Sequence, residues 1–318
     1  MTCHMDQLLA QAGLDLKAEP FVVVPGHTAR RAARSITEAY TRLEAVSGEK
    51  LGPIVLCLLE GYGFGENHPY AKAAMPIAAA IEARDTPQPV NPYHNAHHTL
   101  EVVLNAHYLA ARNDVVAINI RLTQREHALL CLAALIHDFE HDGTMNGKQR
   151  FRLEQLANDT AAPYFQAAGI SGEDQAAIKV MVLATDPAGP NLYMKALHSQ
   201  AFYQAPAPEP ATAFTELAPL AQDLRLLRLA GLLNDADLMS SAGLSLDYAR
   251  RQSDKLGAEG GRYLDCNDML RFLNHIVGGS FTTGAGRFFN LNMSLIKSFS
   301  ELGMSSSNDG IDAPLIRP

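Results

Sequence analysis

One short segment of the chain combines a histidine and an aspartate in a position where both should be buried. Nine consecutive apolar residues, 128–136, run directly into His137 and Asp138. A run that is apolar on every side is typical of a buried helix, so the groups at its end should also lie away from water. An unpaired charge in such a place is costly, and the usual compensation is a partner charge or a metal ion.

Two other segments could bring partners to this pair. Residues 224–233 are mostly apolar and lead into Asp235 and Asp237, which we expect at the end of a second buried helix. Residues 93–98 read Tyr-His-Asn-Ala-His-His, and the spacing of His94 and His98 would place both on one helical face. Imidazole and carboxylate ligands together suit zinc, manganese, iron or magnesium. The pattern predicts a metal cluster gathered from three helices.

A structural alternative exists for each of these residues. Taken singly, a buried histidine or aspartate is more often a hydrogen-bonded core residue than a ligand, and only their combination favours a metal centre. A structural zinc site is not indicated, because the four cysteines form no CxxC pair. These thiols are expected to be reduced. The cysteines are Cys3, Cys57, Cys131 and Cys266.

Composition limits the class of protein. The chain has 318 residues, 47% of them hydrophobic and 19% charged, as in soluble globular proteins. Leucine and alanine dominate, which favours an all-α fold. The net charge of −8 argues against a nucleic-acid polymer as partner. No segment has transmembrane length and no signal peptide is recognisable, so we expect no membrane partner and a cytoplasmic location. The sequence leaves a homodimer open.

The elements that must position the histidines and acids are all predicted to be helices. Thr123 and Glu126 form a capping box that begins the helix leading to His137. We expect an N-terminal extension (1–28), a single helical domain (29–301) and a flexible tail (302–318). The predicted helices span about 30–46, 52–60, 70–84, 94–111, 123–137, 150–168, 173–185, 190–203, 214–233, 243–257, 266–277 and 286–300.

Four segments resemble the signatures of one enzyme family. Residues 93–98 with 101–102 resemble the YHNxxHAxDV motif of class I cyclic nucleotide phosphodiesterases, and residues 137–146 resemble their HDxxHPGxxN motif. Residues 182–186 match the family's VLATD, and residues 236–238 match the beginning of its ADLS. The matches occur in family order. The resemblance implies an HD-type phosphohydrolase fold, a compact bundle of helices around a buried binuclear metal site.

The resemblance also implies a cofactor and a ligand set. Two divalent metal ions are expected, usually zinc in the first site and magnesium or manganese in the second. Asp138 would bridge the two ions, and water would complete most of the second site. The implied ligands of the first ion are His98, His137, Asp138 and Asp237.

The implied activity is hydrolysis of 3',5'-cyclic nucleotides (cAMP, cGMP or both) to 5'-nucleotides by a metal-bridging hydroxide. His94 would act as the general acid, because an imidazole titrates near the working pH. Tyr93 would position the acid or the phosphate, and His141 would contact metal-bound waters. Asn146 and Thr185 would belong to the surrounding shell and help to bind the substrate.

The sequence departs from the family pattern where the purine base is recognised. The QxxF segment of the family corresponds best to residues 269–272, which keep Phe272 but have Met269 in place of glutamine. A methionine can pack against a base but cannot form paired amide hydrogen bonds. Phe272 would be either a stacking clamp or a plain core residue. Asp142 replaces the proline of the second motif, and Ser240 replaces the asparagine of ADLSNP.

Three hypotheses for function follow. The first is the cyclic nucleotide phosphodiesterase just described. The second keeps the metal chemistry but changes the substrate to another phosphodiester or phosphomonoester, with relaxed base recognition. The third is a catalytically silent helical module that binds a nucleotide or a partner protein. The complete set of ligands and His94 count against this third hypothesis, because a silent module does not need them.

Overall fold

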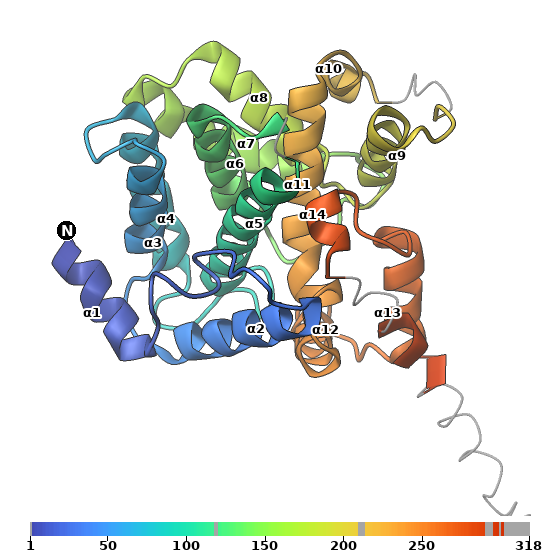
Figure 1. The fold of residues 1–318 in the computed structure, drawn as a ribbon, viewed down its shortest axis with the longest axis horizontal. Helices are drawn as coiled ribbons and strands as arrows, with labels where there is room; N and C mark the ends of the chain where they lie inside the picture. Colours follow the sequence, from blue (N-terminus) through green and yellow to red (C-terminus); the bar gives the residue numbers. More distant parts are fainter. Residues whose placement is uncertain (1, 118–119, 209–213, 290–294, 299, 302–318) are drawn as a thin grey trace, which may run out of the picture.

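The structure is a computed structural model that describes residues 2–117, 120–208, 214–289, 295–298 and 300–301. Two long helices, α5 (Ala96–Val116) and α11 (Leu224–Ala242), pack against each other near the middle of the fold (Figure 1). Helix α6 (Gln124–Ile136) packs against both. Each residue from 128 to 136 is buried, as an apolar run at the centre of a core should be. These three helices supply the framework on which the predicted ligands lie.

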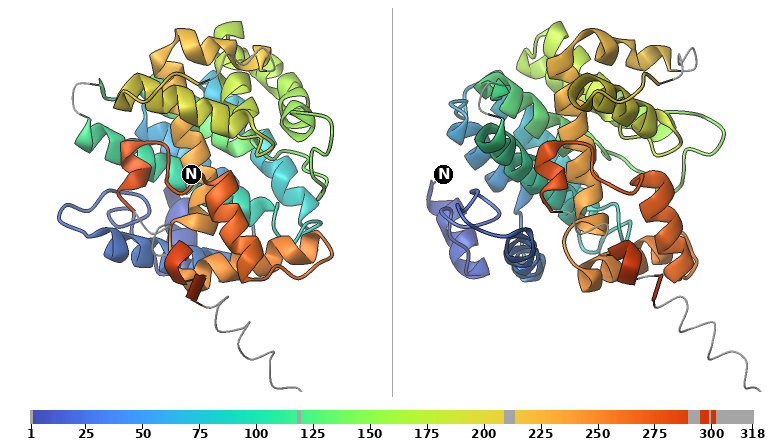
Figure 2. Two further views of the ribbon diagram at one scale, coloured as in Figure 1. Left: turned by 90° about the vertical axis from the view of Figure 1, so that its right-hand side faces the viewer. Right: turned by 45° about the vertical axis from the view of Figure 1, so that its right-hand side comes forward.

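The remaining helices surround this centre. The first helices, drawn in blue, and the last helices, drawn in red, lie on opposite sides of α5 and α11 in the right-hand view of Figure 2. None of the described residues lies in a β-strand, and the predicted all-α fold is confirmed. These helices are α1 (Thr2–Ala12), α2 (Ala29–Ala45), α3 (Leu51–Gly61), α4 (Pro69–Arg84), α7 (Arg152–Ala168), α8 (Gly172–Leu183), α9 (Pro190–Tyr203), α10 (Ala218–Gln222), α12 (Leu246–Glu259), α13 (Cys266–Arg271) and α14 (Gly284–Arg287).

Side-chain caps fix where two of the central helices begin. The Thr123 hydroxyl accepts the backbone N–H of Glu126 while the Glu126 carboxylate accepts that of Thr123, as the predicted capping box requires. At α5 the Asn95 side chain accepts the N–H groups of His97 and His98. His94 therefore precedes the helix. The expectation that His94 and His98 share one helical face is wrong, because Asn95 takes the capping position between them.

The boundaries of α11 also differ from the prediction. Asp223 caps α11 by accepting the N–H groups of Arg225 and Leu226, which divides the predicted helix 214–233 into α10 and α11. The helix then continues to Ala242. Asp235 and Asp237 consequently lie within the helix and not at its end. No proline or glycine interrupts residues 234–242, and Gly243 follows directly, so helical geometry continues until that point.

The C-terminal elements differ in part from the prediction. The predicted helix 266–277 is α-helical in α13 and then continues as a π-helical turn, η3 (Phe272–Ile276). Of the predicted helix 286–300, residues 286 and 287 belong to α14 and residues 295–298 and 300 are helical, while residues 290–294 and 299 lie outside the described part of the chain. The predicted tail, 302–318, lies outside it as well.

The N-terminal segment packs on the bundle. Helix α1 contacts α2 and α3 and buries apolar side chains against them. Thr28 caps α2, which is consistent with a segment boundary at that residue. Among the described residues, none of the helices combines the length and apolar character needed to span a lipid bilayer. The side chains that α1 buries are Met5, Leu8, Leu9 and Ala12.

Asp235 joins α11 to the C-terminal segment. Its fully buried carboxylate accepts the N–H of Thr282, the N–H of Thr283 and the Thr283 hydroxyl, each at 2.7 Å.

Asp235→Ala would leave these donors buried and unpaired, so we expect a free energy of unfolding lower by about 3 kcal/mol. Urea denaturation in the presence of EDTA measures this without a contribution from bound metal. Asp254→Ala, at an exposed position on α12, is the matched control and should change stability little. Equal stability of the two variants would contradict the role of Asp235.

Candidate active site

Four side chains from distant parts of the chain meet at one place. His98 lies in α5, His137 and Asp138 follow the end of α6, and Asp237 lies in α11. One ligand atom from each of the four lies within 4.8 Å of the others. The closest pair joins Nε2 of His137 and Oδ2 of Asp138 at 3.0 Å, and Nε2 of His98 lies 3.4 Å from the same oxygen. The four residue types and this convergence could hold a metal ion.

The hydrogen bonding of the two imidazoles fits metal binding. Nδ1 of His137 lies 2.8 Å from the carbonyl oxygen of Ala134, so this nitrogen donates its proton to the backbone. The lone pair of Nε2 is then directed at the acids, as is common for metal-ligating histidines. Nε2 of His98 and Nε2 of His137 are buried beside the Asp138 carboxylate, and neither forms a hydrogen bond of good geometry with any of the described residues. A buried nitrogen without a partner is costly, and a cation between the imidazoles and carboxylates would remove that cost.

The acids strongly favour positive charge at this place. Burial lowers the pKa of His98, but Asp138 and Asp237 together raise it to about 10. Burial alone would raise the pKa of Asp138. The charges of His137 and His94 outweigh the effect of burial and hold this pKa well below its usual range. The cluster therefore holds a proton when no other cation is present. A divalent ion must displace that proton, so metal binding should be weaker at lower pH.

His94 lies beside the cluster in a fixed orientation. Its Nε2 is 4.0 Å from Oδ2 of Asp138, and its Nδ1 contacts a carboxylate oxygen of Glu259 directly. The second oxygen of Glu259 accepts the backbone N–H groups of Tyr93 and His94, each at 3.0 Å. Burial raises the pKa of Glu259, but the hydrogen bond from His94 outweighs this and brings it to about 2. An ionised Glu259 thus holds the imidazole with Nε2 on the side of Asp138.

Glu259 was not predicted from the sequence. It is the last residue of α12 and precedes Gly260 and Gly261, so in the sequence it looks like one more acid at the end of an amphipathic helix. The group His94, His141 and Glu259 also has the residue types of a metal site. The direct contact between His94 and Glu259 leaves no room for an ion between these two side chains.

His141 and the loop around it restrain His94 from the other side. The two imidazoles stack with ring centroids 3.6 Å apart and an angle of 21° between the planes. The carbonyl of His141 accepts hydrogen bonds from Asn91 at 2.8 Å and from Arg84 at 3.1 Å. Burial lowers the pKa of His141 to about 4, although the negative charge of Asp138 acts to raise it. The His141 ring is therefore neutral at physiological pH.

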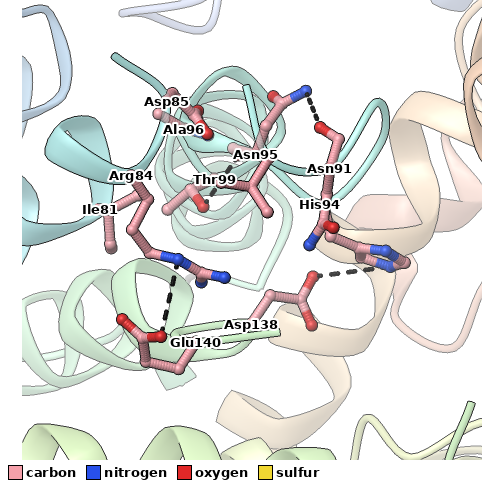
Figure 3. A pocket seen from close by; sticks show the side chains of 11 residues that line it. Ile81, Arg84, Asp85, Asn91, His94, Asn95, Ala96, Thr99, Asp138 and Glu140 are labelled. Atoms are coloured by element: carbon pink, nitrogen blue, oxygen red, sulfur yellow. Dashed lines mark hydrogen bonds and ion pairs between the residues drawn. The ribbon is translucent and has the colours of Figure 1, made fainter. Parts of the chain in front are cut away.

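A small pocket beside His94 and Asp138 lies between Glu140 and the start of α5 (Figure 3). Arg84 points towards Glu140 there, with Nε of Arg84 3.6 Å from Oε2 of Glu140. Gly143 has a φ of +76°, and a Cβ at this position would lie 2.9 Å from Oδ1 of Asn91, so the loop requires glycine. Asp142, which replaces the family's proline, forms an ion pair of 2.6 Å with Arg152.

Tyr93 packs against the two histidines of its own motif. Its ring centroid lies 4.7 Å from that of His94 and 4.6 Å from that of His98. Its hydroxyl oxygen is 2.8 Å from Oγ of Ser241 in α11. Burial, followed by the charge of Asp237, raises the pKa of Tyr93 well above its ordinary value. Tyr93 therefore stays neutral, and these contacts favour a positioning role for it.

Asn146 and Thr185, two of the other predicted substrate-binding residues, form local hydrogen bonds. The side chain of Asn146 bonds to the backbone N–H of Leu153 and to Glu154, and the Thr185 hydroxyl donates to the carbonyl of Val182. Their assignment to the surrounding shell stays a prediction.

Met269 is buried in the core, and Phe272 packs partly buried against it. Among the described residues, no hydrogen bond, ion pair or ring contact links either side chain to the metal ligands. Ser240, at the position of the family's asparagine, is fully buried, and Asn105 donates a hydrogen bond of 3.2 Å to it. The predicted role of Met269 and Phe272 in binding a base stays a prediction.

The buried side chain of Glu154, close to the second motif, should make the free energy of unfolding depend on pH. Burial, and then the charge of Asp186, raises its pKa from 4.5 to about 7. The folded protein keeps this proton up to about pH 7, whereas the unfolded chain releases it near pH 4.5. The protonated Glu154 therefore contributes to the free energy of unfolding below pH 4.5, and this contribution is lost as the pH rises through 7. This loss amounts to at most about 3 kcal/mol.

A Glu154→Gln variant tests this pH dependence, because glutamine has nearly the same shape and does not titrate. Its free energy of unfolding, measured in urea with EDTA present, should fall less than that of the parent between pH 5 and pH 8. Glu66→Gln, at an exposed position, should behave like the parent. The same pH dependence in all three proteins would show that Glu154 does not titrate in this way.

Comparisons with known proteins match one segment of the chain and its fold. Residues 93–161 match the family model described as 3'5'-cyclic nucleotide phosphodiesterase, which covers less than a quarter of the chain. A crystal structure of the phosphodiesterase domain of a rhodopsin phosphodiesterase from the choanoflagellate Salpingoeca rosetta is 17% identical, with a TM-score of 0.62. The similarity covers 94% of this chain and 97% of that one.

Two further structures show the same fold. Another structure of the phosphodiesterase domain of the Salpingoeca rosetta fusion protein is 18% identical with a TM-score of 0.61, covering 83% of this chain and 94% of that one. The structure of LmjPDEB1 in complex with IBMX is 17% identical with a TM-score of 0.58, covering 96% of this chain and 99% of that one. At these identities the likeness shows the fold, which is that of phosphodiesterase catalytic domains.

The matched segment and the fold both resemble one class of protein. The resemblance to class I cyclic nucleotide phosphodiesterases is confirmed by the family match and by the structural neighbours. The same findings support a cyclic nucleotide phosphodiesterase enzyme.

Proposed function

We propose that this chain hydrolyses 3',5'-cyclic nucleotides to 5'-nucleotides, using two divalent metal ions and His94 as the general acid. The observation that carries the proposal is the convergence of the four ligand side chains with an unligated His94 held beside them. His98, His137, Asp138 and Asp237 would hold the first ion, and Asp138 would also contact the second. Bound divalent ions supply Lewis-acid activation of the nucleophile and neutralise charge on the phosphoryl group.

In this proposal His94 protonates the leaving oxygen. Opening the cyclic diester expels a sugar alkoxide, which is a poor leaving group unless it receives a proton. Nε2 of His94 faces the metal ligands, and Nδ1 is bound by Glu259, so Nε2 is the atom that donates. Glu259 stabilises the protonated imidazole and fixes its plane together with the stacked ring of His141. Because this geometry exists before the substrate binds, little reorganisation is needed during the reaction.

The identity of the base and the metals belongs to the proposal as well. We propose cAMP, cGMP or both as substrates, with zinc in the first site and magnesium or manganese in the second. We also propose a cytoplasmic enzyme with one catalytic domain over residues 29–301 and a packed N-terminal extension. A homodimer is compatible with these features.

A second function is favoured by one specific observation. Met269 stands where the family has the glutamine that recognises purines, and a thioether cannot form the paired hydrogen bonds of an amide. The same metal site would then act on another phosphodiester or a phosphomonoester with little preference for the base.

Product identification tests these alternatives. Purified protein loaded with zinc and manganese is incubated with cAMP, cGMP and bis(p-nitrophenyl) phosphate, and the products are separated by chromatography. Formation of 5'-AMP or 5'-GMP supports the first function. Weak turnover of both nucleotides at similar rates, together with rapid cleavage of the aryl diester, supports the second. Protein that contains metal but cleaves none of these substrates would contradict both, and protein without metal would favour a silent module.

A further inference from the structure

A cleft lies between α1, α3 and α4, away from the metal ligands. These three helices are drawn in blue shades at the left of Figure 1. The cleft encloses about 330 Å³ and has a mainly apolar lining. This volume is at the lower end of the range found for pockets that bind small molecules.

The wall of the cleft is built from flexible and small side chains. Met5 of α1, Leu56 of α3 and Met75 of α4 supply apolar surface, and methionine adapts its shape to different ligands. Gly52 leaves space at the wall, since a Cβ there would approach Cε of Met75 to 3.3 Å. Cys57, half-buried in α3, places its thiol in the same wall.

Four carboxylates surround this apolar wall, and no lysine or arginine lies among the residues that line it. The side-chain carboxylates of Asp6, Glu49 and Glu60 form no hydrogen bond or ion pair with any of the described residues. The fourth, Glu82, accepts the backbone N–H groups of Lys50 and Leu51, so it is partly compensated. Three uncompensated acids around a small apolar cleft create a negative potential that a cation would offset.

We propose that the cleft between α1, α3 and α4 binds a small protonated amine with an apolar body. The apolar part lies against Leu56 and the methionines, and the ammonium group donates hydrogen bonds to the acids at the edge. A carboxylate ligand would be repelled by the same acids. A neutral ligand would gain only the apolar contact. The cleft therefore selects its ligand by charge as well as by size.

Three matched probes test the selection by charge. The probes 4-phenylbutylamine, 4-phenylbutanol and 4-phenylbutyrate share one apolar body and differ in the charge of one end. Isothermal titration of the full chain at pH 7 should give a Kd for the amine about tenfold lower than for the alcohol, with the carboxylate weakest. Equal Kd values for amine and alcohol would overturn the proposal, because the cleft would then select only apolar groups.

Substitutions of the acidic residues at the edge of the cleft test whether the amine binds there. Glu49→Gln with Glu60→Gln removes two charges with little change of shape, and should raise the Kd of the amine about tenfold while leaving that of the alcohol unchanged. Glu66→Gln removes an exposed acid that does not line the cleft and should change neither value. An unchanged affinity for the amine in the double variant would overturn the assignment of the site.

Cys57 provides a second, independent measurement. In a Cys3→Ser, Cys266→Ser background, Cys57 and the buried Cys131 remain. A cationic reagent, 2-aminoethyl methanethiosulfonate, and an anionic one, 2-sulfonatoethyl methanethiosulfonate, both transfer their thioalkyl group to the Cys57 thiolate and release methanesulfinate. Burial, and then the charges of Glu60 and Asp6, raises the pKa of this thiol. The ratio of the two rates cancels this effect, because both reagents attack the same thiolate.

The expected result is modification by the cationic reagent about tenfold faster than by the anionic one. The ratio should fall towards one in the Glu49→Gln, Glu60→Gln protein. Saturating 4-phenylbutylamine should slow both reactions by occupying the cleft. A ratio near one in the parent, or full reactivity in the presence of the amine, would overturn the proposal. Hydrolase activity plays no part in these measurements, so they are independent of the proposed function.

Discussion

An Asp237→Asn variant should lose both its bound metal and its hydrolysis of cyclic nucleotides. Oδ1 of Asp237 lies 3.5 Å from Nε2 of His98 and 3.7 Å from Nε2 of His137, facing the space where a cation would be held. An asparagine has the same shape but lacks the charge that attracts a divalent ion. We expect kcat/KM to fall about 10³-fold or more, since the metal lowers the barrier by several kcal/mol.

Metal analysis by mass spectrometry after gel filtration, run beside the activity assay, measures both losses. Asp159→Asn is the matched control: it makes the same change of charge at an exposed position on α7, where the Asp159 side chain forms no hydrogen bond or ion pair with any described residue. The control should retain metal and activity. Circular dichroism of each variant shows that the fold is kept. Full metal content in Asp237→Asn would contradict the assignment of this ligand.

The parts of the fold that follow from nearby residues were predictable. The capping box of Thr123 and Glu126, and the apolar run up to His137, each depend on a few consecutive residues, and both are confirmed. Helix boundaries were harder to predict where several residues could begin or end a helix. The Asp223 cap divides one predicted helix, and α11 continues past Asp237 because nothing before Gly243 stops it.

The site was predictable where its residues belong to recognisable motifs, and Glu259 shows the limit. Its contact with His94 spans 165 residues and depends on how the end of α12 meets the start of α5. That relation is a property of helix packing, which no local pattern encodes. The buried contact between Tyr93 and Ser241 has the same origin, since 148 residues separate them. The motifs therefore predict which residues react, while packing determines which side chains contact them.

A His94→Ala variant should keep its metal and lose turnover according to the leaving group. General acids contribute about 10² to 10⁴-fold, so kcat for a cyclic nucleotide, whose leaving group is an alkoxide, should fall by that factor. Cleavage of bis(p-nitrophenyl) phosphate should fall much less, because p-nitrophenolate leaves without a proton. The comparison of the two substrates in one protein sample separates the loss of the acid from a general loss of structure. Equal losses for both substrates would contradict the acid assignment.

Glu259→Gln extends the test to the residue that orients His94. Glutamine can still accept the backbone N–H groups of Tyr93 and His94, but it carries no charge to stabilise a protonated imidazole. We expect a loss of about tenfold to a hundredfold in kcat for the cyclic nucleotide, smaller than for His94→Ala, and again little loss for the aryl diester. Glu66→Gln serves as the exposed control. In the double variant, Glu259→Gln should add almost nothing to His94→Ala, because Glu259 acts only through that imidazole. Additive losses would show that Glu259 has a separate role.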